Sequence, residues 1–498
     1  MKKFTLSFVC VFAVLLIVFF TASEVTGTSS KYASNDDYMK SENLALRADE
    51  TKINDSNDNT VYRFSKRNGA EIVLDLGETV EFNSVILKEK GLNVQEFVLS
   101  ASNDGKNYKD FYRNDKIEFH RLCSFEEVEA RYVKFTVIKS DAVPKIREFE
   151  IYNEDAEKNT DFRVTAYSTI GTEIYSVIDD ASVPESQKDA EIQKMINADY
   201  FDTVTDYIQI GNVSWDENGK VTALGWDGVQ YDEEKYYARM MKNLHAVLDP
   251  LDVNLVVTIL NPTGEGGNEK VMRSITENRD ELISNMIEFA NKYQIDGIDL
   301  DWEFPMSQEE FDAYNSFLQK LKLRMDSEMW NKDDSTLSLA VATWALKYTP
   351  ETIKCIDYVN VMGYDILDQD GQHSSFFSSC VQAADYIESQ GFSKEQIMVG
   401  VPFYGTYVEG NMEQYLYKNI NYDEITPYNN YYTMQHYETG EDRYTYFNSQ
   451  AIIRDKTAYA YYKGYGGIMI FSLYCDVDPT DSKSLTKSIN DFLEEAKK

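Results

Sequence analysis

The sequence predicts an α/β fold in which a TIM (β/α)8 barrel follows a smaller N-terminal all-β jelly-roll domain. Two observations support this fold class. In residues 162–498, short apolar runs alternate with stretches of helical hydrophobic spacing, which is typical of a barrel of parallel strands. In residues 31–153, short alternating runs are broken by turn sequences such as Asn103-Asp-Gly105, which is an all-β pattern.

The N-terminus is expected to be a secretory signal peptide at residues 1–27. Lys2 and Lys3 precede an apolar run at residues 8–20, and small and polar residues follow it. Cys10 lies inside the apolar run, which argues against a lipoprotein anchor, while an uncleaved anchor is an open alternative. No other stretch approaches the length of a membrane span. The expected location is therefore secreted and extracellular.

The all-β domain has a recognisable set of sequence blocks. They are Leu-Asp-Leu-Gly at 74–77, Ser-Asn-Asp-Gly-Lys-Asn-Tyr at 102–108, Ala-Arg-Tyr-Val-Lys at 130–134 and Ile-Arg-Glu-Phe-Glu-Ile-Tyr at 146–152. These blocks resemble a discoidin or coagulation factor 5/8 type C domain, and the resemblance implies a jelly roll that often serves as a carbohydrate-binding module. The domain contains no tryptophan, so sugar binding by it stays open. Residues 154–161 are the expected linker.

The most informative segment of the chain is Asp-Gly-Ile-Asp-Leu-Asp-Trp-Glu at residues 296–303. In a strand, Asp299, Asp301 and Glu303 would share one face. Neighbouring carboxylates would lie roughly 7 Å apart, so at least one pKa should rise and provide a general acid. Asp296 is out of this register and is expected to brace the strand entry. The alternatives are a solvated acidic edge strand and a hard-cation site, but the helical pattern before the segment favours a barrel strand.

Together with Phe304-Pro305, this segment resembles the DxxDxDxE signature of glycoside hydrolase family 18, the chitinase and endo-β-N-acetylglucosaminidase family. The resemblance extends roughly from Arg163 to the C-terminus. Three further blocks resemble the sixth, seventh and eighth strands of that family. They are Val-Asn-Val-Met-Gly-Tyr-Asp at 359–365, Met-Val-Gly-Val-Pro-Phe-Tyr-Gly at 398–405 and Gly-Gly-Ile-Met-Ile-Phe-Ser at 466–472.

The first, second, third and fifth strands of the barrel are expected where a short apolar run precedes a polar loop. These runs are 164–167, 207–210, 255–259 and 337–342. Sites in such barrels lie at the C-terminal ends of the strands. Glu303, Tyr364, Asp365 and Phe471 all fall at such ends.

The family resemblance implies a retaining, substrate-assisted mechanism. Glu303 would protonate the glycosidic oxygen, and the 2-acetamido carbonyl of the substrate would attack the anomeric carbon to form an oxazolinium intermediate. Water activated by Glu303 would then open this intermediate. Asp301 would orient the acetamido N–H, and Asp299 would share its proton. Tyr364 would bind the acetamido carbonyl.

Other side chains are expected to bind the substrate. The resemblance assigns Asp365 to a sugar hydroxyl or to the same network as Tyr364, and Met362 to the pocket floor. Phe471 stands where the family usually has a tryptophan. Aromatic residues near strand ends are candidates for extending the cleft, with Trp344 the strongest. The others are Tyr404, Tyr167, Trp215, Trp226 and Phe403.

The third strand departs from the family pattern. Thr258-Ile-Leu-Asn261 stands where the family usually has Ser-x-Gly-Gly, so the close backbone approach that paired glycines permit is lost. Non-glycine loops at this place also occur in the endoglycosidase branch, which trims N-glycans. The insertion at 415–446 is short, which favours a shallow cleft and endo action.

Composition restricts the partners. Lys and Arg number 49 against 84 Asp and Glu, and this net charge of −35 repels nucleic acid and anionic membranes. We expect a monomer that binds a neutral N-acetylglucosamine-containing polysaccharide or N-glycan, with no membrane contact beyond the signal peptide. The four cysteines outside the signal peptide do not resemble a disulfide framework, and no cofactor or metal is expected.

Three hypotheses follow from the sequence. The leading one is a secreted glycoside hydrolase that cleaves β-1,4 linkages of N-acetylglucosamine in chitin-like polymers. The second is an endo-β-N-acetylglucosaminidase that acts on the chitobiose core of N-glycans. The third is a non-catalytic lectin, against which the intact Glu303 argues.

Overall fold

The structure is a computed structural model. It describes residues 38–49, 51–154, 161–225, 228–264, 266–332, 334–367, 373–407, 414–420, 425–436 and 439–496. Residues 37–498 form one compact unit. The expected signal peptide and most of the expected linker lie outside the described residues. Within the described ranges, no helix has both the length and the apolar character needed to cross a membrane.

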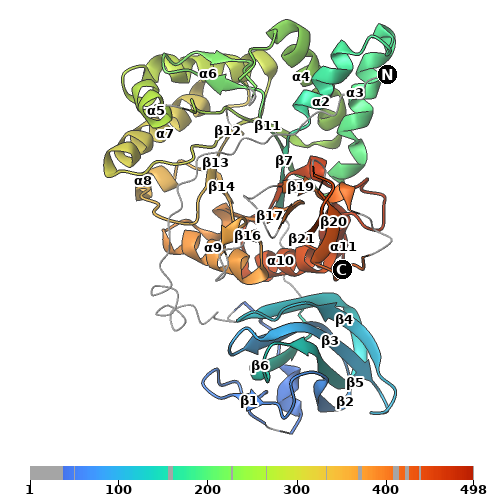
Figure 1. The fold of residues 1–498 in the computed structure, drawn as a ribbon. Helices are drawn as coiled ribbons and strands as arrows, with labels where there is room; N and C mark the ends of the chain where they lie inside the picture. The colour runs from blue at the N-terminus through green and yellow to red at the C-terminus, as the bar shows by residue number, and fades with distance from the viewer. Residues whose placement is uncertain are drawn as a thin grey trace. The chain divides into compact units, whose positions relative to one another are not determined.

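The N-terminal domain is a six-stranded antiparallel sheet with the order β1-β6-β2-β5-β3-β4 (Figure 1). Its strands are β1 Tyr62–Arg63, β2 Ala70–Glu89, β3 Val94–Ser102, β4 Lys109–Asn114, β5 Arg121–Ser140 and β6 Lys145–Tyr152. The register of β2 against β5 shifts between Asp75 and Val80 and again between Phe82 and Ser84. Such irregularities bend long strands, which allows the sheet to enclose a core that contains Phe97, Phe135 and Phe149.

The second domain is a closed barrel of eight parallel strands in the order β11-β12-β13-β14-β17-β22-β7-β8. The strands are β7 Arg163–Ser168, β8 Asp206–Gln209, β11 Asn254–Thr258, β12 Gly297–Leu300, β13 Thr336–Val341, β14 Tyr358–Val361, β17 Ile397–Pro402 and β22 Gly467–Phe471. The predicted fold class is confirmed, and each of the eight strands overlaps the run or motif from which it was predicted.

Helices surround the barrel strands (Figure 1). They are α2 Gly171–Asp179, α3 Glu185–Ile196, α4 Ala238–Leu248, α5 Gly267–Thr276, α6 Arg279–Tyr293, α7 Gln308–Glu328, α8 Pro350–Ile353, α9 Phe377–Ser389, α10 Gln450–Lys463 and α11 Leu485–Ala496. Ser307 begins α7 with a capping box that pairs it with Glu310. This cap ends the loop that leaves β12.

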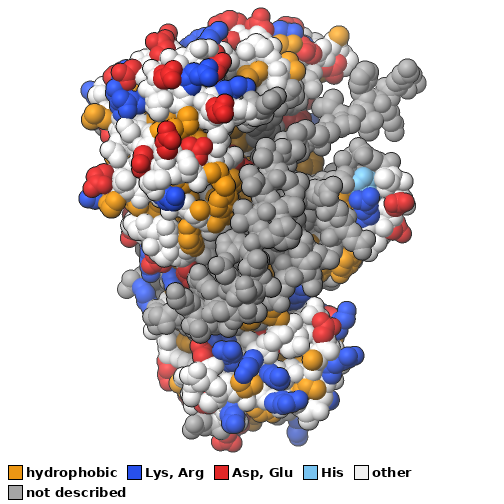
Figure 2. Space-filling view, turned by 60° about the vertical axis from the view of Figure 1, so that its left-hand side comes forward, with side chains coloured by type: hydrophobic (Ala, Val, Ile, Leu, Met, Phe, Trp, Pro, Cys, Tyr) orange, Lys and Arg blue, Asp and Glu red, His pale blue; other side chains and the backbone are white. Residues whose placement is uncertain are grey.

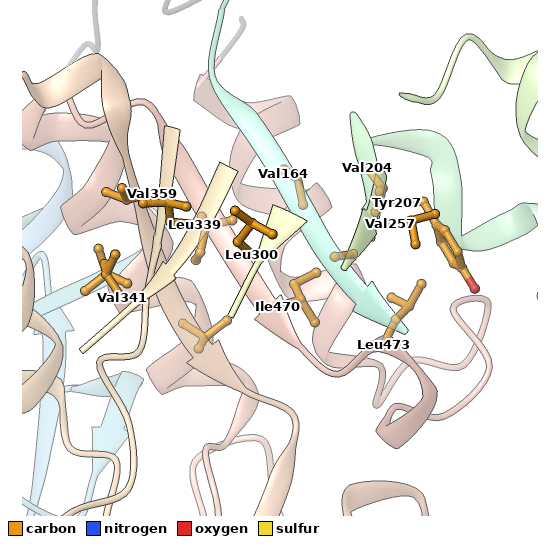
Figure 3. Packing of buried hydrophobic residues seen from close by; sticks show 14 of the residues in the cluster. Val164, Val204, Tyr207, Val257, Leu300, Leu339, Val341, Val359, Ile470 and Leu473 are labelled. Carbon is orange, nitrogen blue, oxygen red and sulfur yellow. The ribbon is translucent and has the colours of Figure 1, made fainter. Parts of the chain in front are cut away.

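The barrel is packed on both sides of its strands. The outer layer joins strands to helices and includes Val164, Leu339 and Ile470, which are labelled in Figure 3. A separate inner layer fills the barrel with residues from six strands, namely Tyr167, Ile208, Ile210, Val256, Tyr358, Met398 and Met469. Strands buried on both faces consist largely of apolar residues, which explains why short apolar runs located them in the sequence.

Gly400 permits a close approach beneath the predicted site. A Cβ atom at this position would lie 2.0 Å from the Val361 carbonyl oxygen and 3.1 Å from the Tyr364 ring. Because both atoms would have to move for any larger residue, this glycine allows the β14 backbone and Tyr364 to pack against β17.

A small antiparallel sheet follows β17, with the order β19-β18-β21-β20. Its strands are β18 Tyr404–Tyr407, β19 Gln414–Leu416, β20 Tyr431–Gln435 and β21 Asp442–Tyr446.

On the face drawn in Figure 2, acidic and basic side chains are interspersed. Among the residues drawn in colour on that face, the acidic side chains do not form one patch.

Candidate active site

The row of carboxylates leaves the sheet earlier than the sequence predicts. The ladder of β12 ends where Asp299 pairs with Thr258 and Leu300 pairs with Leu339. The expectation that the strand continues to Glu303 is wrong: β11 ends at Thr258, and although β13 continues to Val341, the chain after Leu300 does not pair with it. Asp299 thus lies within the barrel wall, whereas Asp301 and Glu303 follow the strand at its C-terminal mouth.

Asp299 is fully buried and is held by hydroxyl groups from three other strands. Its Oδ2 accepts hydrogen bonds from Tyr167 Oη at 3.0 Å and Thr258 Oγ1 at 2.8 Å, and its Oδ1 accepts one from Ser338 Oγ at 2.6 Å. Asn360 Nδ2 lies 3.5 Å from the same Oδ1. Burial raises the pKa of Asp299 to about 6, although these hydrogen bonds oppose the rise.

Asp301 and Glu303 interact with each other at the barrel mouth. Burial raises the pKa of Asp301 well above its usual value, and the charges of Glu303 and Asp299 add to the rise. Oδ1 of Asp301 is buried and has no hydrogen-bond partner among the described residues. A buried polar atom without a partner carries a free-energy cost unless a ligand satisfies it.

Glu303 is exposed, but protein surrounds it at the barrel mouth. This partial desolvation raises the pKa of Glu303 to about 7, and the charge of Asp365 contributes to the rise, while Asp301 opposes it. The expected rise of at least one carboxyl pKa is therefore present. Because the two acids interact, the proton near neutral pH belongs to the Asp301–Glu303 pair.

An aromatic group lies beside these acids. The Tyr364 ring stacks on Phe471 with centroids 5.9 Å apart and an interplanar angle of 23°, and it meets Tyr404 edge-on at 6.2 Å. No hydrogen bond joins the Tyr364 hydroxyl to another described residue. Burial and the charges of Asp365, Asp301 and Glu303 raise the pKa of this phenol well above its usual value. Tyr364 therefore stays protonated and can donate a hydrogen bond to a ligand.

Asp365 and Met362 follow β14 and are half-buried. Asp365 accepts a hydrogen bond from Tyr404 Oη at 2.5 Å, and its backbone N–H donates to Ser375 Oγ at 3.3 Å. The backbone N–H of Met362 donates to the Val341 carbonyl oxygen at 3.1 Å. The C-terminal end of β14 thus contributes a carboxylate, a thioether and the Tyr364 phenol.

The predicted aromatic platforms differ in exposure. Trp344 is half-buried and meets Phe304, the neighbour of Glu303, edge-on at 5.1 Å. Tyr167 and Tyr404 are only 2% and 4% exposed, so their rings offer little surface to a sugar. They instead donate hydrogen bonds to Asp299 and Asp365. Two other candidates, Trp215 and Phe403, are buried in the core, and Trp226 lies outside the described residues.

The side chains that support the acids were not among the residues predicted from the sequence. Thr258 and Ser338 are the register partners of Asp299 on the two neighbouring strands, so correct strand alignment would have found them. Strand alignment does not identify Asn268, which lies in α5. It accepts a hydrogen bond from Trp302 Nε1 at 3.1 Å and donates one to the Phe304 carbonyl oxygen at 3.1 Å, so it holds both neighbours of Glu303.

Asp296 braces the entry of β12, as expected. Its Oδ2 accepts a hydrogen bond from the Leu255 N–H at 2.8 Å, which ties β12 to β11. Its backbone carbonyl accepts hydrogen bonds from the Thr336 N–H at 3.1 Å and Asn331 Nδ2 at 3.0 Å. Asp296 therefore fixes the start of the strand, away from the mouth.

Comparisons with known proteins agree with this geometry. Residues 252–476 match the family model for glycosyl hydrolases family 18, and residues 26–150 match that for the F5/8 type C domain. The killer toxin subunits alpha/beta of Kluyveromyces lactis are 31% identical over 151 residues, which cover 26% of this chain and 13% of that protein. The class V chitinase CHIT5a of Medicago truncatula is 26% identical over 175 residues, which cover 30% of this chain and 46% of that protein.

The chain spans less than half the length of these two curated relatives. A solved chitinase from Bacteroides thetaiotaomicron has 20% sequence identity and a TM-score of 0.50, and the match covers 67% of this chain and 97% of that chain. At this identity, the match shows a common fold. Both predicted family resemblances are confirmed: the chain carries a domain of the glycosyl hydrolases family 18 behind an F5/8 type C domain.

Proposed function

We propose that this protein is a chitinase-like glycoside hydrolase that cleaves β-1,4 linkages of N-acetylglucosamine by a retaining, substrate-assisted mechanism. One observation carries the proposal. An acid with a pKa of about 7, Glu303, lies beside Oδ1 of Asp301 and the phenol of Tyr364, neither of which has a hydrogen-bond partner in the part of the chain that the structure describes. Glu303 can donate a proton to the glycosidic oxygen of a 2-acetamido sugar. Asp301 can accept a hydrogen bond from the acetamido N–H, and Tyr364 can donate one to the acetamido carbonyl.

In the first step, the Glu303 proton moves to the glycosidic oxygen as the bond from that oxygen to the anomeric carbon breaks. The acetamido carbonyl oxygen of the substrate forms the new bond to the anomeric carbon, which gives an oxazolinium ion. Oδ1 of Asp301 accepts a hydrogen bond from the acetamido N–H, and the carboxylate stabilises the positive charge of the oxazolinium ion. Tyr364 donates a hydrogen bond that aims the carbonyl oxygen.

In the second step, the Glu303 carboxylate removes a proton from water. The water oxygen bonds to the anomeric carbon and the oxazolinium ring opens, which restores the acetamido group and gives net retention. Glu303 returns to its protonated form. Asp299 stays within its set of hydroxyl donors and, through its charge, helps to keep the proton on the Asp301–Glu303 pair.

An endo-β-N-acetylglucosaminidase acting on the chitobiose core of N-glycans is the second candidate. The third-strand loop favours it, because Leu260 and Asn261 stand where the family usually has paired glycines, and non-glycine loops at this place also occur in the endoglycosidase branch. Phe471 also gives a smaller stacking face than the usual tryptophan. Glu303 is retained in this chain, which argues against a non-catalytic lectin.

Secretion and a monomeric state are part of the proposal and rest on sequence alone. The basic and apolar pattern of residues 1–27 supports export. N-terminal sequencing of protein recovered from the culture medium tests export and cleavage of the signal peptide. A mature N-terminus close to residue 28 supports cleavage, and protein retained in the membrane fraction with its N-terminus intact refutes it.

Mass spectrometry of products tests the proposed activity. The protein is incubated separately with chitooligosaccharides and with an N-glycosylated protein, and Glu303→Gln serves as the control. Shortened chitin oligomers that the variant does not produce support the chitinase proposal. Released glycans that leave one sugar on asparagine support the second candidate, and no product from either substrate refutes both.

A further inference from the structure

The N-terminal domain supplies the cap of a barrel helix. Glu118 lies in the connection between β4 and β5 and is 5% exposed. Its carboxylate accepts hydrogen bonds from the backbone N–H groups of Phe377 at 3.3 Å and Ser378 at 2.6 Å, the first residues of α9. The N-cap residue of α9, Phe376, makes no side-chain capping bond. Glu118 therefore satisfies the free N–H groups at this helix start, where negative charge is favoured.

Buried groups of the same domain fix the position of Glu118. Arg121 is fully buried, donates to Glu118 Oε1 at 3.4 Å and lies 5.6 Å from the centroid of the Phe377 ring. The His120 ring stacks on Phe377 with centroids 6.1 Å apart and an interplanar angle of 18°. Because these contacts lie away from solvent, the carboxylate has little freedom to leave α9.

A second set of bonds holds the domain against α10. The fully buried Asp455 accepts hydrogen bonds from Tyr112 Oη at 2.6 Å and the Ser124 N–H at 2.9 Å. Arg121 Nε lies 3.8 Å from the same carboxylate. The N-terminal domain is thus joined to the barrel by charged and hydrogen-bonded groups, and within this set Glu118 accepts the hydrogen bonds from the backbone of α9.

The start of α9 leads directly to the candidate active site. Ser375 precedes the helix, and its Oγ accepts the backbone N–H of Asp365 at 3.3 Å. Its carbonyl oxygen accepts hydrogen bonds from Lys456 Nζ at 2.7 Å and Asn448 Nδ2 at 3.1 Å. The two-residue strands β15 Ile366–Leu367 and β16 His373–Ser374 pair antiparallel, so Asp365 and Ser375 form the base of a hairpin.

We propose that Glu118 of the F5/8 type C domain is a positioning residue for the active site: it caps α9, which holds Ser375 and, through Ser375, the Asp365 backbone beside Glu303. The inference rests on the proposed function, because Asp365 is a member of that site. It gives the N-terminal domain a role in catalysis that needs no ligand of its own. Loss of this one carboxylate should therefore alter catalysis at a site that it does not touch.

Full-length variants test the proposal. Glu118→Ala removes both acceptors, Glu118→Gln keeps one oxygen, and Tyr112→Phe is the matched control because it removes a bond between the domains that does not involve α9. We expect roughly tenfold lower kcat on chitooligosaccharides for Glu118→Ala, a smaller loss for Glu118→Gln, and little change in KM. Tyr112→Phe should leave kcat unchanged.

The pH profile separates positioning from general loss of structure. Glu303 is faced by the carboxylates of Asp301 and Asp365, and the charge of Asp365 helps to raise the Glu303 pKa. If Glu118→Ala lets Asp365 move away, the alkaline limb of the kcat profile should shift to lower pH. An unchanged limb together with unchanged kcat overturns the proposal.

Hydrogen exchange gives a readout that does not depend on activity. The amides of Asp365, Phe377 and Ser378 should exchange faster in Glu118→Ala than in the wild type or Tyr112→Phe. If this change appears but the wild-type protein hydrolyses neither substrate, the proposed function fails and the structural link stands. If the wild type is active and the exchange of these amides is the same in all variants, the link is refuted.

Discussion

Replacing Tyr364 with phenylalanine removes one oxygen atom from the site without breaking a hydrogen bond between described residues. The ring contacts with Phe471 and Tyr404 remain, because neither uses the hydroxyl. The unfolding free energy should therefore change by no more than about 0.5 kcal/mol. Removing one preorganised donor to the reacting group typically lowers kcat about 10²-fold, or about 2.7 kcal/mol.

Tyr167→Phe is the matched control, since it removes the same atom from a tyrosine whose hydroxyl is hydrogen-bonded inside the protein. The Tyr167 hydroxyl donates to Asp299 at 3.0 Å and accepts from Asn360 Nδ2 at 3.0 Å. Losing a buried hydrogen bond to a carboxylate costs about 1.5–3 kcal/mol of unfolding free energy. The two variants should thus separate: Tyr364→Phe mainly loses activity, and Tyr167→Phe mainly loses stability.

The assay combines kcat measured on a fluorogenic chitooligosaccharide with urea unfolding of each variant. Activity of Tyr364→Phe within twofold of the wild type would refute the assignment of its hydroxyl to the acetamido carbonyl. A loss of stability as large as that of Tyr167→Phe would show that Tyr364 is a structural residue.

Three further predictions concern the acids. Hydrolysis should decline above pH about 7, because Glu303, with a pKa of about 7, must be protonated to act as the acid; a rate that stays constant to pH 9 would contradict this. Asp301→Asn should lower kcat by about 10²–10³ with little effect on KM, and steady-state kinetics on the same substrate check it; a change confined to KM would contradict it. Burial raises the Asp299 pKa from 3.8 to about 6, so the folded state holds this proton more tightly than the unfolded state. The unfolding free energy should therefore fall as the pH rises from about 4 to about 6, and Asp299 should contribute about 3 kcal/mol to this fall. Urea unfolding should show a shallower fall for Asp299→Asn than for the wild type, and an equal fall in both proteins would refute the prediction.

Most of the barrel was predictable because its strands are apolar on both faces and end in polar loops. The error at β12 has a physical cause. Alternating residues continue in the sequence up to Glu303, but strand pairing stops at Leu300, since β11 ends at Thr258 and the chain after Leu300 leaves β13, which continues to Val341. Periodicity describes one segment, whereas the length of a strand depends on its neighbours.

The site was predictable only where a motif carried it. The charges of Asp299 and Glu303 raise the pKa of Asp301, and all three acids raise the pKa of Tyr364, so these four residues lie close together in the structure. The hydroxyls that hold Asp299 come from strands far apart in the chain, so their roles depend on strand register. Glu118 depends on how two domains meet, and a single sequence contains no pattern for such a contact.

The most direct test of the central claim is the stereochemistry of the first product. ¹H NMR during the first minutes of hydrolysis of a chitooligosaccharide resolves the new reducing end before it mutarotates. Substrate-assisted catalysis through Glu303 predicts that the β-anomer forms first and that Glu303→Gln forms none. Initial release of the α-anomer would indicate direct attack by water and would contradict the mechanism.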